Sequence, residues 1–242
     1  MMSMDGLADY SRNGGYVQGG VTMTNETVKC NFDRGRRFDV DVMDDLETAG
    51  LAFGRLSAQF IRDKVVPELD AFRFASYCGI SGVTKKEETL ADGAATVAAL
   101  STAVTAMDDE EVTATGRYLF ITPTLLQGIN DMDTTKSKKV LEGFEQVIKV
   151  PQRRFYTAIK QLSGKTGEEA GGYTKATGAA NINFAIVQKD ALIQYTKHAA
   201  PKIIAPENNP DADAYVFGYR MVGIAKAYKN MLSGMYFSHD KA

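Results

Sequence analysis

The chain has 242 residues, of which 44% are hydrophobic and 24% are charged, and its formal net charge is -2. This composition excludes an intrinsically disordered protein, and the near-neutral charge gives no overall basic field for sequence-specific nucleic-acid binding. The length allows a large core, which we expect two lobes to share. Cys30 and Cys78 are isolated in the sequence, so we predict neither a disulfide framework nor a zinc site, and a reducing cytoplasm fits.

The N-terminal residues predict an extended hairpin. Residues 14–20 (GGYVQGG) form a flexible break, and residues 21–32 are rich in Thr and Val, which favour strands. Residues 33–35 (DRG) form a turn signal, which we place near the hairpin tip. Apolar and charged side chains then alternate through residues 37–42, as in a returning strand.

A long helix is predicted to begin at Asp44. Hydrophobic residues recur at steps of three and four and share one helical face: Leu46, Ala49, Phe53, Leu56 and Phe60. Asp44, Asp45 and Glu47 lie in the first turn, where the helix dipole favours carboxylates. Pro67 removes a backbone donor and should kink or break the helix near Val66, about 34 Å from its start at roughly 1.5 Å per residue.

The middle of the chain predicts a second helix followed by strands. Residues 85–88 are interpreted as a solvated charged linker. Thr89 and Asp92 resemble a capping box at the start of an amphipathic helix. Residues 117–122 (RYLFIT) form a compact apolar strand stopped by the following proline, and residues 146–159 have further strand character.

The last third predicts mostly strands around one long loop. Residues 161–180 contain five glycines and few hydrophobic residues, so they are interpreted as an exposed loop or hairpin tip. The segments expected after it are a strand at 182–186, a short helix at 190–196, a Pro- and Asn-rich loop at 201–213, and closing strands at 215–228 and 234–238.

Residues 164–166 (GKT) resemble the end of a phosphate-binding loop. The required leading glycine would fall at Ile159, and residues 167–173 do not start an amphipathic helix whose N-terminus could hold an anion. A flexible loop is therefore the favoured interpretation. The less favoured alternative is a nucleotide-binding enzyme that binds ATP through Lys165.

No other pattern indicates catalysis or metal binding. His198 and His239 have no second ligand at helical or strand spacing, and the acidic residues 108–111 lack the spacing of a calcium loop. The sequence has no nucleophile elbow, no signal-peptide pattern and no stretch long and apolar enough to span a membrane. We therefore predict no catalytic residue, no metal site and no cofactor, and a protein that acts through its surfaces.

Six segments together resemble a known family. In chain order they are LADYSRNGGYVQGGVTMTNET, NFDRGRRFDVDVMDDLET, FIRDKVVPELDAFRF, VPQRRFYTAI, INFAIVQKDALIQYTKHAAPKI and NPDADAYVFGYR. They resemble the major capsid proteins of tailed bacteriophages, which have the HK-ninety-seven-type fold that encapsulins and the herpesvirus capsid floor share. The resemblance covers most of the chain and rests on the number and order of the segments, because none is a catalytic motif.

The resemblance implies an α+β fold with an extended E-loop hairpin, a P-domain with a long spine helix, and a central A-domain. The glycine-rich residues 161–180 would be the P-loop of the capsid fold, a tip that meets neighbouring subunits. The implied division of the chain is a short N-terminal arm at 1–13, the E-loop hairpin at 14–43, the P-domain at 44–78 and 149–198, and the A-domain at 79–148 and 199–242.

The resemblance also implies a structural protein without enzymatic activity. It would self-assemble through pentamers and hexamers into an icosahedral phage head around double-stranded DNA, in the host bacterial cytoplasm, and reside in the virion capsid. Its partners would be other copies of the chain, scaffolding, portal and decoration proteins, and DNA through weak non-specific contacts. An encapsulin-like compartment shell is the alternative. No covalent crosslink between subunits is expected.

Residues 31–50 separate positive from negative charge sharply. A helix start accounts for the acidic residues without any partner, but it does not account for the arginines. We hypothesise that the arginines reach acidic surface on an adjacent subunit. The predicted inter-subunit contact residues are Arg34, Arg36, Arg37, Asp44, Asp45 and Glu47.

Overall fold

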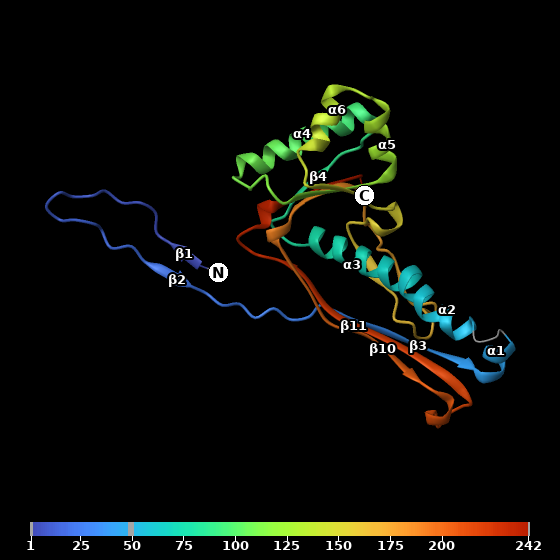
Figure 1. Ribbon diagram of the computed structural model, residues 1–242. Helices are drawn as coiled ribbons and strands as arrows, with labels where there is room; N and C mark the ends of the chain where they lie inside the picture. Colours follow the sequence, from blue (N-terminus) through green and yellow to red (C-terminus); the bar gives the residue numbers. More distant parts are fainter. Residues whose placement is uncertain (1, 48–50, 242) are drawn as a thin grey trace.

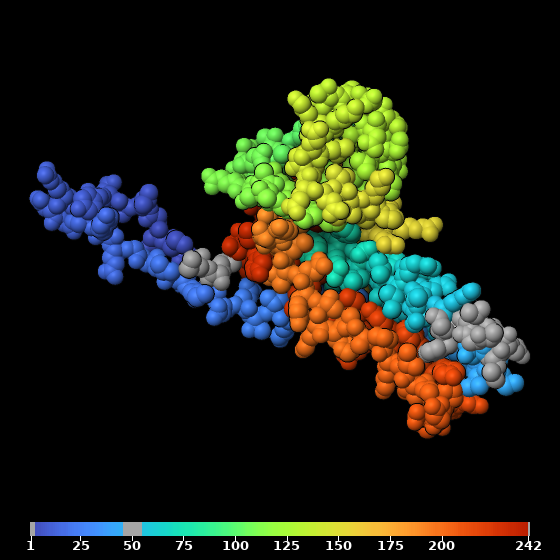
Figure 2. All heavy atoms as spheres, viewed as in Figure 1, coloured from blue at the N-terminus to red at the C-terminus, as the bar shows by residue number. Residues whose placement is uncertain are grey.

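The computed structural model describes residues 2–47 and 51–241. It contains two principal β-sheets, a long helical segment and an arm that projects from the body (Figure 1). The space-filling view shows the arm standing clear of the body (Figure 2). This mixture of helices and strands confirms the predicted α+β class.

The arm is the N-terminal hairpin. Strands β1 (Met2–Met4) and β2 (Val21–Met23) pair antiparallel, and an isolated bridge between Ser11 and Gly15 closes the turn at its tip. Gly15 has a φ of 71°, a backbone conformation that residues with a Cβ atom rarely adopt. The hairpin thus turns at 11–15, so the prediction that residues 33–35 form its tip is wrong.

Residues 33–35 instead lie inside a continuous strand, β3 (Phe32–Asp41). This strand pairs antiparallel with its neighbour from Phe32 to Asp41 without interruption, which overrides the local turn signal. A Cβ atom added to Gly35 would lie 2.7 Å from the Tyr219 carbonyl oxygen. The glycine therefore serves close approach of two strands rather than a turn.

Strand β3 belongs to a three-stranded antiparallel sheet of order β10-β11-β3. The two other strands, β10 (Leu192–Ile204) and β11 (Ala214–Ala227), form a long ribbon with a bulge between Thr196 and His198. The prediction of a short helix at 190–196 is wrong, because residues 192–196 are extended in β10. The predicted loop at 201–213 is wrong at its start, because residues 201–204 also belong to β10. The closing strand predicted at 215–228 is confirmed.

A helical segment runs along one face of this sheet (Figure 1). It comprises α1 (Val42–Glu47), α2 (Leu51–Phe60), a π-helical turn η1 (Ile61–Val65) and α3 (Val66–Cys78). The predicted irregularity at Pro67 is present as the π turn, which accommodates the missing N–H group while the helix continues. Phe60 packs against Phe38 and Phe217, with ring centroids 4.8 and 6.3 Å away. Ala49 and the side chains of Leu46 and Phe53 lie outside the described part.

The second sheet has five strands in the order β4-β12-β9-β5-β6. Its strands are β4 (Thr84–Glu87), β5 (Arg117–Ile121), β6 (Gln146–Lys149), β9 (Ile182–Gln188) and β12 (Met235–His239). Every residue of the central strand β9 is buried. The charged linker predicted at 85–88 is wrong, since β4 pairs parallel with β12 at the sheet edge, where all its side chains are exposed.

Three helices cover this sheet: α4 (Gly93–Asp109), α5 (Pro123–Asp131) and α6 (Thr135–Glu142). The Asp92 side chain caps α4 by accepting a 2.8 Å hydrogen bond from the Ala95 N–H group, so the box predicted with Thr89 is wrong. Helices α4 and α5 approach closely, because a Cβ atom on Gly93 would lie 2.2 Å from the Gly128 carbonyl oxygen. No helix within residues 2–47 and 51–241 is long and apolar enough to cross a membrane.

The remaining elements are short. Strands β7 (Ile159–Gln161) and β8 (Tyr173–Lys175) form a hairpin, which confirms the hairpin tip predicted within 161–180. The 3-10 turns are η2 (Gln152–Arg154), η3 (Lys189–Ala191), η4 (Pro206–Asn208) and η5 (Leu232–Gly234). Sheet membership thus groups β4–β6, β9 and β12 in one lobe with α4–α6, and β3, β10 and β11 in another with the long helical segment (Figure 1).

Candidate assembly surfaces

The tip of the β7–β8 hairpin holds the GKT sequence, and the backbone amides on either side of it are hydrogen-bonded to carboxylates of the same loop. The Ser163 N–H group donates to Glu168 Oε2 at 2.7 Å, and the Gly167 N–H group donates to Glu169 Oε1 at 2.7 Å. Lys160 lies 2.6 Å from Glu168, and this pair, together with the Ser163 amide, lowers the pKa of Glu168 to about 2. The chain's own carboxylates therefore accept from the amides that flank GKT, and strand β8 follows the loop where an anion-binding helix is required. These contacts do not favour the nucleotide-binding alternative.

Arg34 joins three separate elements. Its Nε atom lies 2.8 Å from Glu68 Oε1 on α3, and its Nη2 atom donates to the Leu162 and Gly172 carbonyl oxygens at 2.7 and 3.2 Å. Both members of the ion pair are mostly shielded from solvent, with side-chain exposures of 27% and 13%. Arg34 therefore fixes the base of the β7–β8 hairpin against β3 and α3.

Arg36 reaches the same hairpin farther out. Its Nη2 atom donates to the Glu169 carbonyl oxygen at 2.9 Å. A Cβ atom added to Gly164 or Gly171 would lie 2.9 Å from Arg36 Nη1, and both glycines have positive φ. The guanidinium group thus packs against the loop at two positions where only glycine leaves enough room for it.

Arg37 points to the opposite face of the sheet, because successive side chains of a strand alternate. Its Nε atom lies 2.9 Å from Asp39 Oδ1, and this carboxylate raises the pKa of Arg37. All three arginines therefore have partners within their own chain. Their contact with an adjacent subunit stays a prediction; Arg36 and Arg37 are exposed, Arg37 over half of its side chain, whereas Arg34 is mostly shielded.

The predicted acidic contact residues lie at α1. Asp44 and Asp45 occupy its first turn, as expected from the helix dipole. Asp44 is exposed and Asp45 half-buried. Glu47 ends the helix, and its side chain lies outside the described part.

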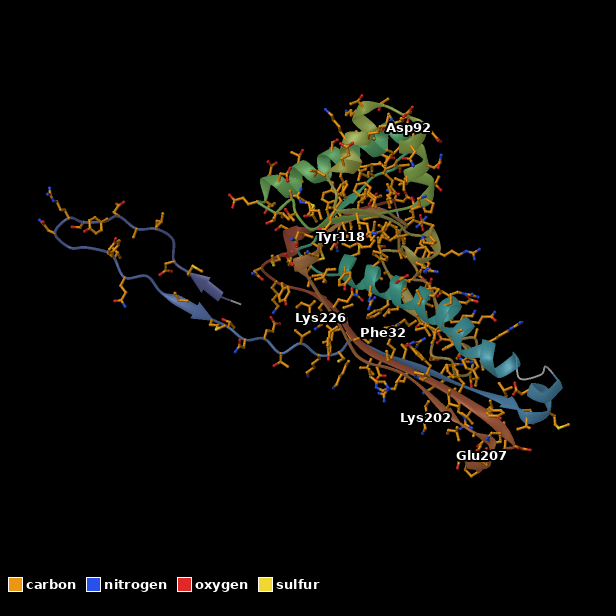
Figure 3. The ribbon with its side chains drawn as sticks, viewed as in Figure 1. Phe32, Asp92, Tyr118, Lys202, Glu207 and Lys226 are labelled. Carbon is orange, nitrogen blue, oxygen red and sulfur yellow. The ribbon has the colours of Figure 1, made fainter. Side chains whose placement is uncertain are left out.

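The arm exposes an unusual amount of apolar surface. Residues 3–27 are exposed except for Gly15, and their side chains stand free of the body (Figure 3). Seven large hydrophobic side chains on the arm are exposed by 62% or more: Met4, Leu7, Tyr10, Tyr16, Val17, Val21 and Met23. So many exposed apolar side chains on one projecting segment are typical of an interaction site.

The root of the arm is firmly attached. The Asn31 side chain donates to the Ala225 carbonyl oxygen and accepts from the Ala225 N–H group, both at 2.9 Å. The Asn31 N–H group also donates to the Gly223 carbonyl oxygen at 3.2 Å, and Lys229 lies 2.8 Å from Glu26. The arm is therefore anchored at its base, and its outer part stands clear of the body (Figures 2 and 3). These contacts join residues far apart in the sequence, so local patterns gave no signal for them.

The outward face of the three-stranded sheet carries a shallow hollow of about 440 Å³. Its floor is made of small residues, Gly35, Ala200 and Gly218, and cationic side chains surround it. Lys202 projects from this face, away from the helical segment (Figure 3). Arg37, His198 and Arg220 also stand around the hollow, whereas Arg36 and Tyr219 border it from the strands while their side chains contact the hairpin and Phe60 on the other face.

The charges around this hollow are only partly neutralised. Arg220 donates to both carboxylate oxygens of Asp33 at 2.9 and 2.6 Å, which lowers the pKa of Asp33. Arg37 is paired with Asp39. Among the described residues, Lys202 has no ion-pair partner, so the hollow keeps a positive character.

Solved structures show what this architecture is similar to. No family model matches the sequence, and no curated protein matches it. A chain of the capsid of the cyanophage P-SCSP1u superposes with a TM-score of 0.60 at 13% identity, over 99% of this chain and 83% of that one. A chain from Gordonia phage Cozz gives 0.61 at 10% identity, over 100% and 81%. The virus-like particle from Pyrococcus furiosus gives 0.56 at 8% identity, over 98% and 86%.

These similarities extend over essentially the whole chain. The protein therefore has the fold of tailed-phage capsid chains, which confirms the resemblance inferred from the sequence at the level of fold.

Proposed function

We propose that this chain is the major capsid protein of a tailed bacteriophage, which self-assembles through pentamers and hexamers into an icosahedral head around double-stranded DNA. The observation that carries the proposal is the similarity to capsid structures over 98–100% of the chain. The exposed apolar arm supports it, because an isolated subunit provides no cover for that surface. The protein acts by assembly and has no turnover.

Within this proposal the parts of the capsid fold are assigned as follows. The E-loop predicted at 14–43 takes in β2 of the projecting hairpin and β3, the N-terminal arm predicted at 1–13 supplies the first strand of that hairpin, and α2 with α3 corresponds to the spine helix. The β7–β8 tip is the loop that meets neighbouring subunits. The division into a P-domain at 44–78 and 149–198 and an A-domain at 79–148 and 199–242 remains a prediction. The two sheets group the chain differently, because β9 lies in one sheet with β4, β5, β6 and β12, and β11 lies in the other with β3 and β10.

The proposed location is the virion capsid, after assembly in the host bacterial cytoplasm. The proposed partners are other copies of the chain, scaffolding, portal and decoration proteins, and DNA. Contacts with DNA are weak and non-specific in this proposal, in keeping with the formal net charge of -2.

Size-exclusion chromatography with electron microscopy of the purified chain tests assembly. Closed shells or hexameric and pentameric rings are expected. Monomers or dimers at all protein and salt concentrations would contradict the proposal. Nuclease-protected DNA inside shells purified from infected cells supports a phage head, whereas an enclosed enzyme supports an encapsulin-like compartment.

The arginine hypothesis has its own test. Charge reversal of Arg36 and Arg37 to glutamate is expected to impair assembly while the subunit stays folded, because both guanidinium groups lie on exposed surface. Circular dichroism of the unassembled subunit measures folding, and electron microscopy measures shells. Normal shells from the double variant would remove the hypothesis.

A further inference from the structure

Among the described residues, two large surfaces have no other element packed against them, and β3 connects one to the other. The first is the outward face of the β10-β11-β3 sheet, since α2 and α3 cover only the other face. The second is the arm, which continues from β3 at residue 32 toward the N-terminus. The five-stranded sheet differs, because its central strand is buried on both faces.

The arm tip presents a compact aromatic knob. Tyr10 and Tyr16 flank the turn closed by Ser11 and Gly15, and their rings meet edge to face with centroids 5.0 Å apart. The two tyrosines are 63% and 90% exposed. Asp9 is exposed beside them, and Arg12 is the one cation between residues 9 and 16. The turn therefore holds two rings and a carboxylate together on one small projection.

The hollow on the sheet has complementary properties. A floor of Gly35, Ala200 and Gly218 leaves room for flat rings against the backbone. Arg37, Lys202 and Arg220 stand around that floor. Cations attract the faces of aromatic rings, and tyrosine adds a hydroxyl group that can bond at the rim. An unpaired Lys202 also suits the carboxylate of Asp9.

We infer that the Tyr10–Tyr16 knob of one copy seats in the hollow between Arg37, Lys202 and Arg220 of a second copy. This inference rests on the proposed assembly and names the residues of one contact within it. The arm and the hollow are different surfaces of the same chain, so the contact is heterologous and passes from one copy to the next. Repeated by rotation, such a contact closes a ring.

Proximity labelling between two chains tests the contact directly. Both chains carry Cys30→Ser, because Cys30 is exposed, whereas Cys78 is buried. One chain also carries Asn13→Cys at the arm tip, and the other carries Ala200→Cys in the hollow. After co-assembly, a short bismaleimide is expected to give a covalent dimer several-fold above the yield of a matched control with Lys136→Cys on α6.

The control and the wild-type chain separate the possible outcomes. Dimer yields equal to the Lys136→Cys control in assembled material would overturn this inference and leave the proposed function standing. A wild-type chain that never assembles defeats the proposed function itself.

A substitution series tests the contact without cysteines. Tyr10→Ala with Tyr16→Ala is expected to raise the protein concentration needed for assembly about tenfold, whereas Tyr10→Phe with Tyr16→Phe keeps the rings and most of the effect. Lys202→Gln with Arg37→Gln is expected to act in the same direction and to add little to the alanine pair, because both remove one interaction. Wild-type assembly by the alanine pair, or full additivity, overturns the inference.

Discussion

The five-stranded sheet and the N-terminal arm differ in where their hydrophobic side chains lie: the sheet buries them within the chain, and the arm exposes them to solvent. Strand β9 buries all seven of its residues between α4–α6 and the elements around Phe155, so that lobe is complete within one chain. The arm exposes seven large hydrophobic side chains and is hydrogen-bonded to the body at its root. The difference shows that one chain can contain both a fully packed core and a large exposed apolar surface. Burying that surface requires another molecule.

The largest expected loss of stability comes from a substitution in the core of the five-stranded sheet. Phe184→Ala removes a fully buried ring and should lower the free energy of unfolding by about 3–5 kcal/mol. Tyr16→Ala on the arm is the matched control and should change it by less than about 0.5 kcal/mol, because the ring is exposed. Urea unfolding of the unassembled subunit measures both. Equal losses for the two variants would contradict the contrast between the regions.

The next effect concerns the hairpin that Arg34 holds. Arg34→Ala leaves the shielded Glu68 carboxylate without its cation and should cost about 1–3 kcal/mol, measured by urea unfolding. Hydrogen exchange at residues 159–175 should become faster. Arg37→Ala is the control on the same strand, and its midpoint should match the wild type because its ion pair is exposed. Unchanged exchange in Arg34→Ala would exclude the role assigned to Arg34.

A smaller effect is expected at the root of the arm. Asn31→Ala removes two hydrogen bonds to Ala225 and should cost about 1–2 kcal/mol of local stability. Proteolysis near residue 30 should accelerate while the thermal midpoint of the body hardly moves. Asn25→Ala, on the exposed part of the arm, is the control. A proteolysis rate equal to that of the control would show that the root is not held by Asn31.

The smallest effect is a pH dependence confined to the β7–β8 tip. The folded pKa of Glu168, about 2, lies below its ordinary value of 4.5, because Lys160 and the Ser163 amide favour the carboxylate. The ionised Glu168 side chain therefore stabilises the tip fully above pH 4.5, and this stabilisation is lost as the pH falls from 4.5 toward 2. Amide exchange at Ser163 measured between pH 6 and about 2.5 should show the loss, and Glu168→Gln should abolish the dependence. Constant protection in the wild type would contradict it.

Part of the fold was predictable because it depends on local patterns. Strands β5, β9 and β11 have apolar residues dense or regular enough to identify from sequence. Strand β4 (TKKE) does not, since it is an edge strand with every side chain exposed. The DRG turn signal failed because β11 gives β3 a continuous partner. Local preference is weak against a ten-residue ladder.

The candidate site was less predictable than the fold. The stretch around Arg34 stood out for its charge, but its partners Leu162 and Gly172 are 128 and 138 residues away along the chain. Asn31 and Ala225 are 194 residues apart. The hollow depends on three small residues from three strands, which only the register of the sheet brings together. Such sites require the tertiary pairing to be known.

The edge of β10 is built in a way that disfavours strand pairing between copies of this chain. A long, regular strand edge is a template on which identical strands add without limit. Here Lys197 sits at the bulge between Thr196 and His198, and Pro201 lacks an N–H donor, so the row of backbone groups is broken twice. The chain can therefore reach high local concentration without growing filaments from this edge, and contact between copies is left to side chains and loops.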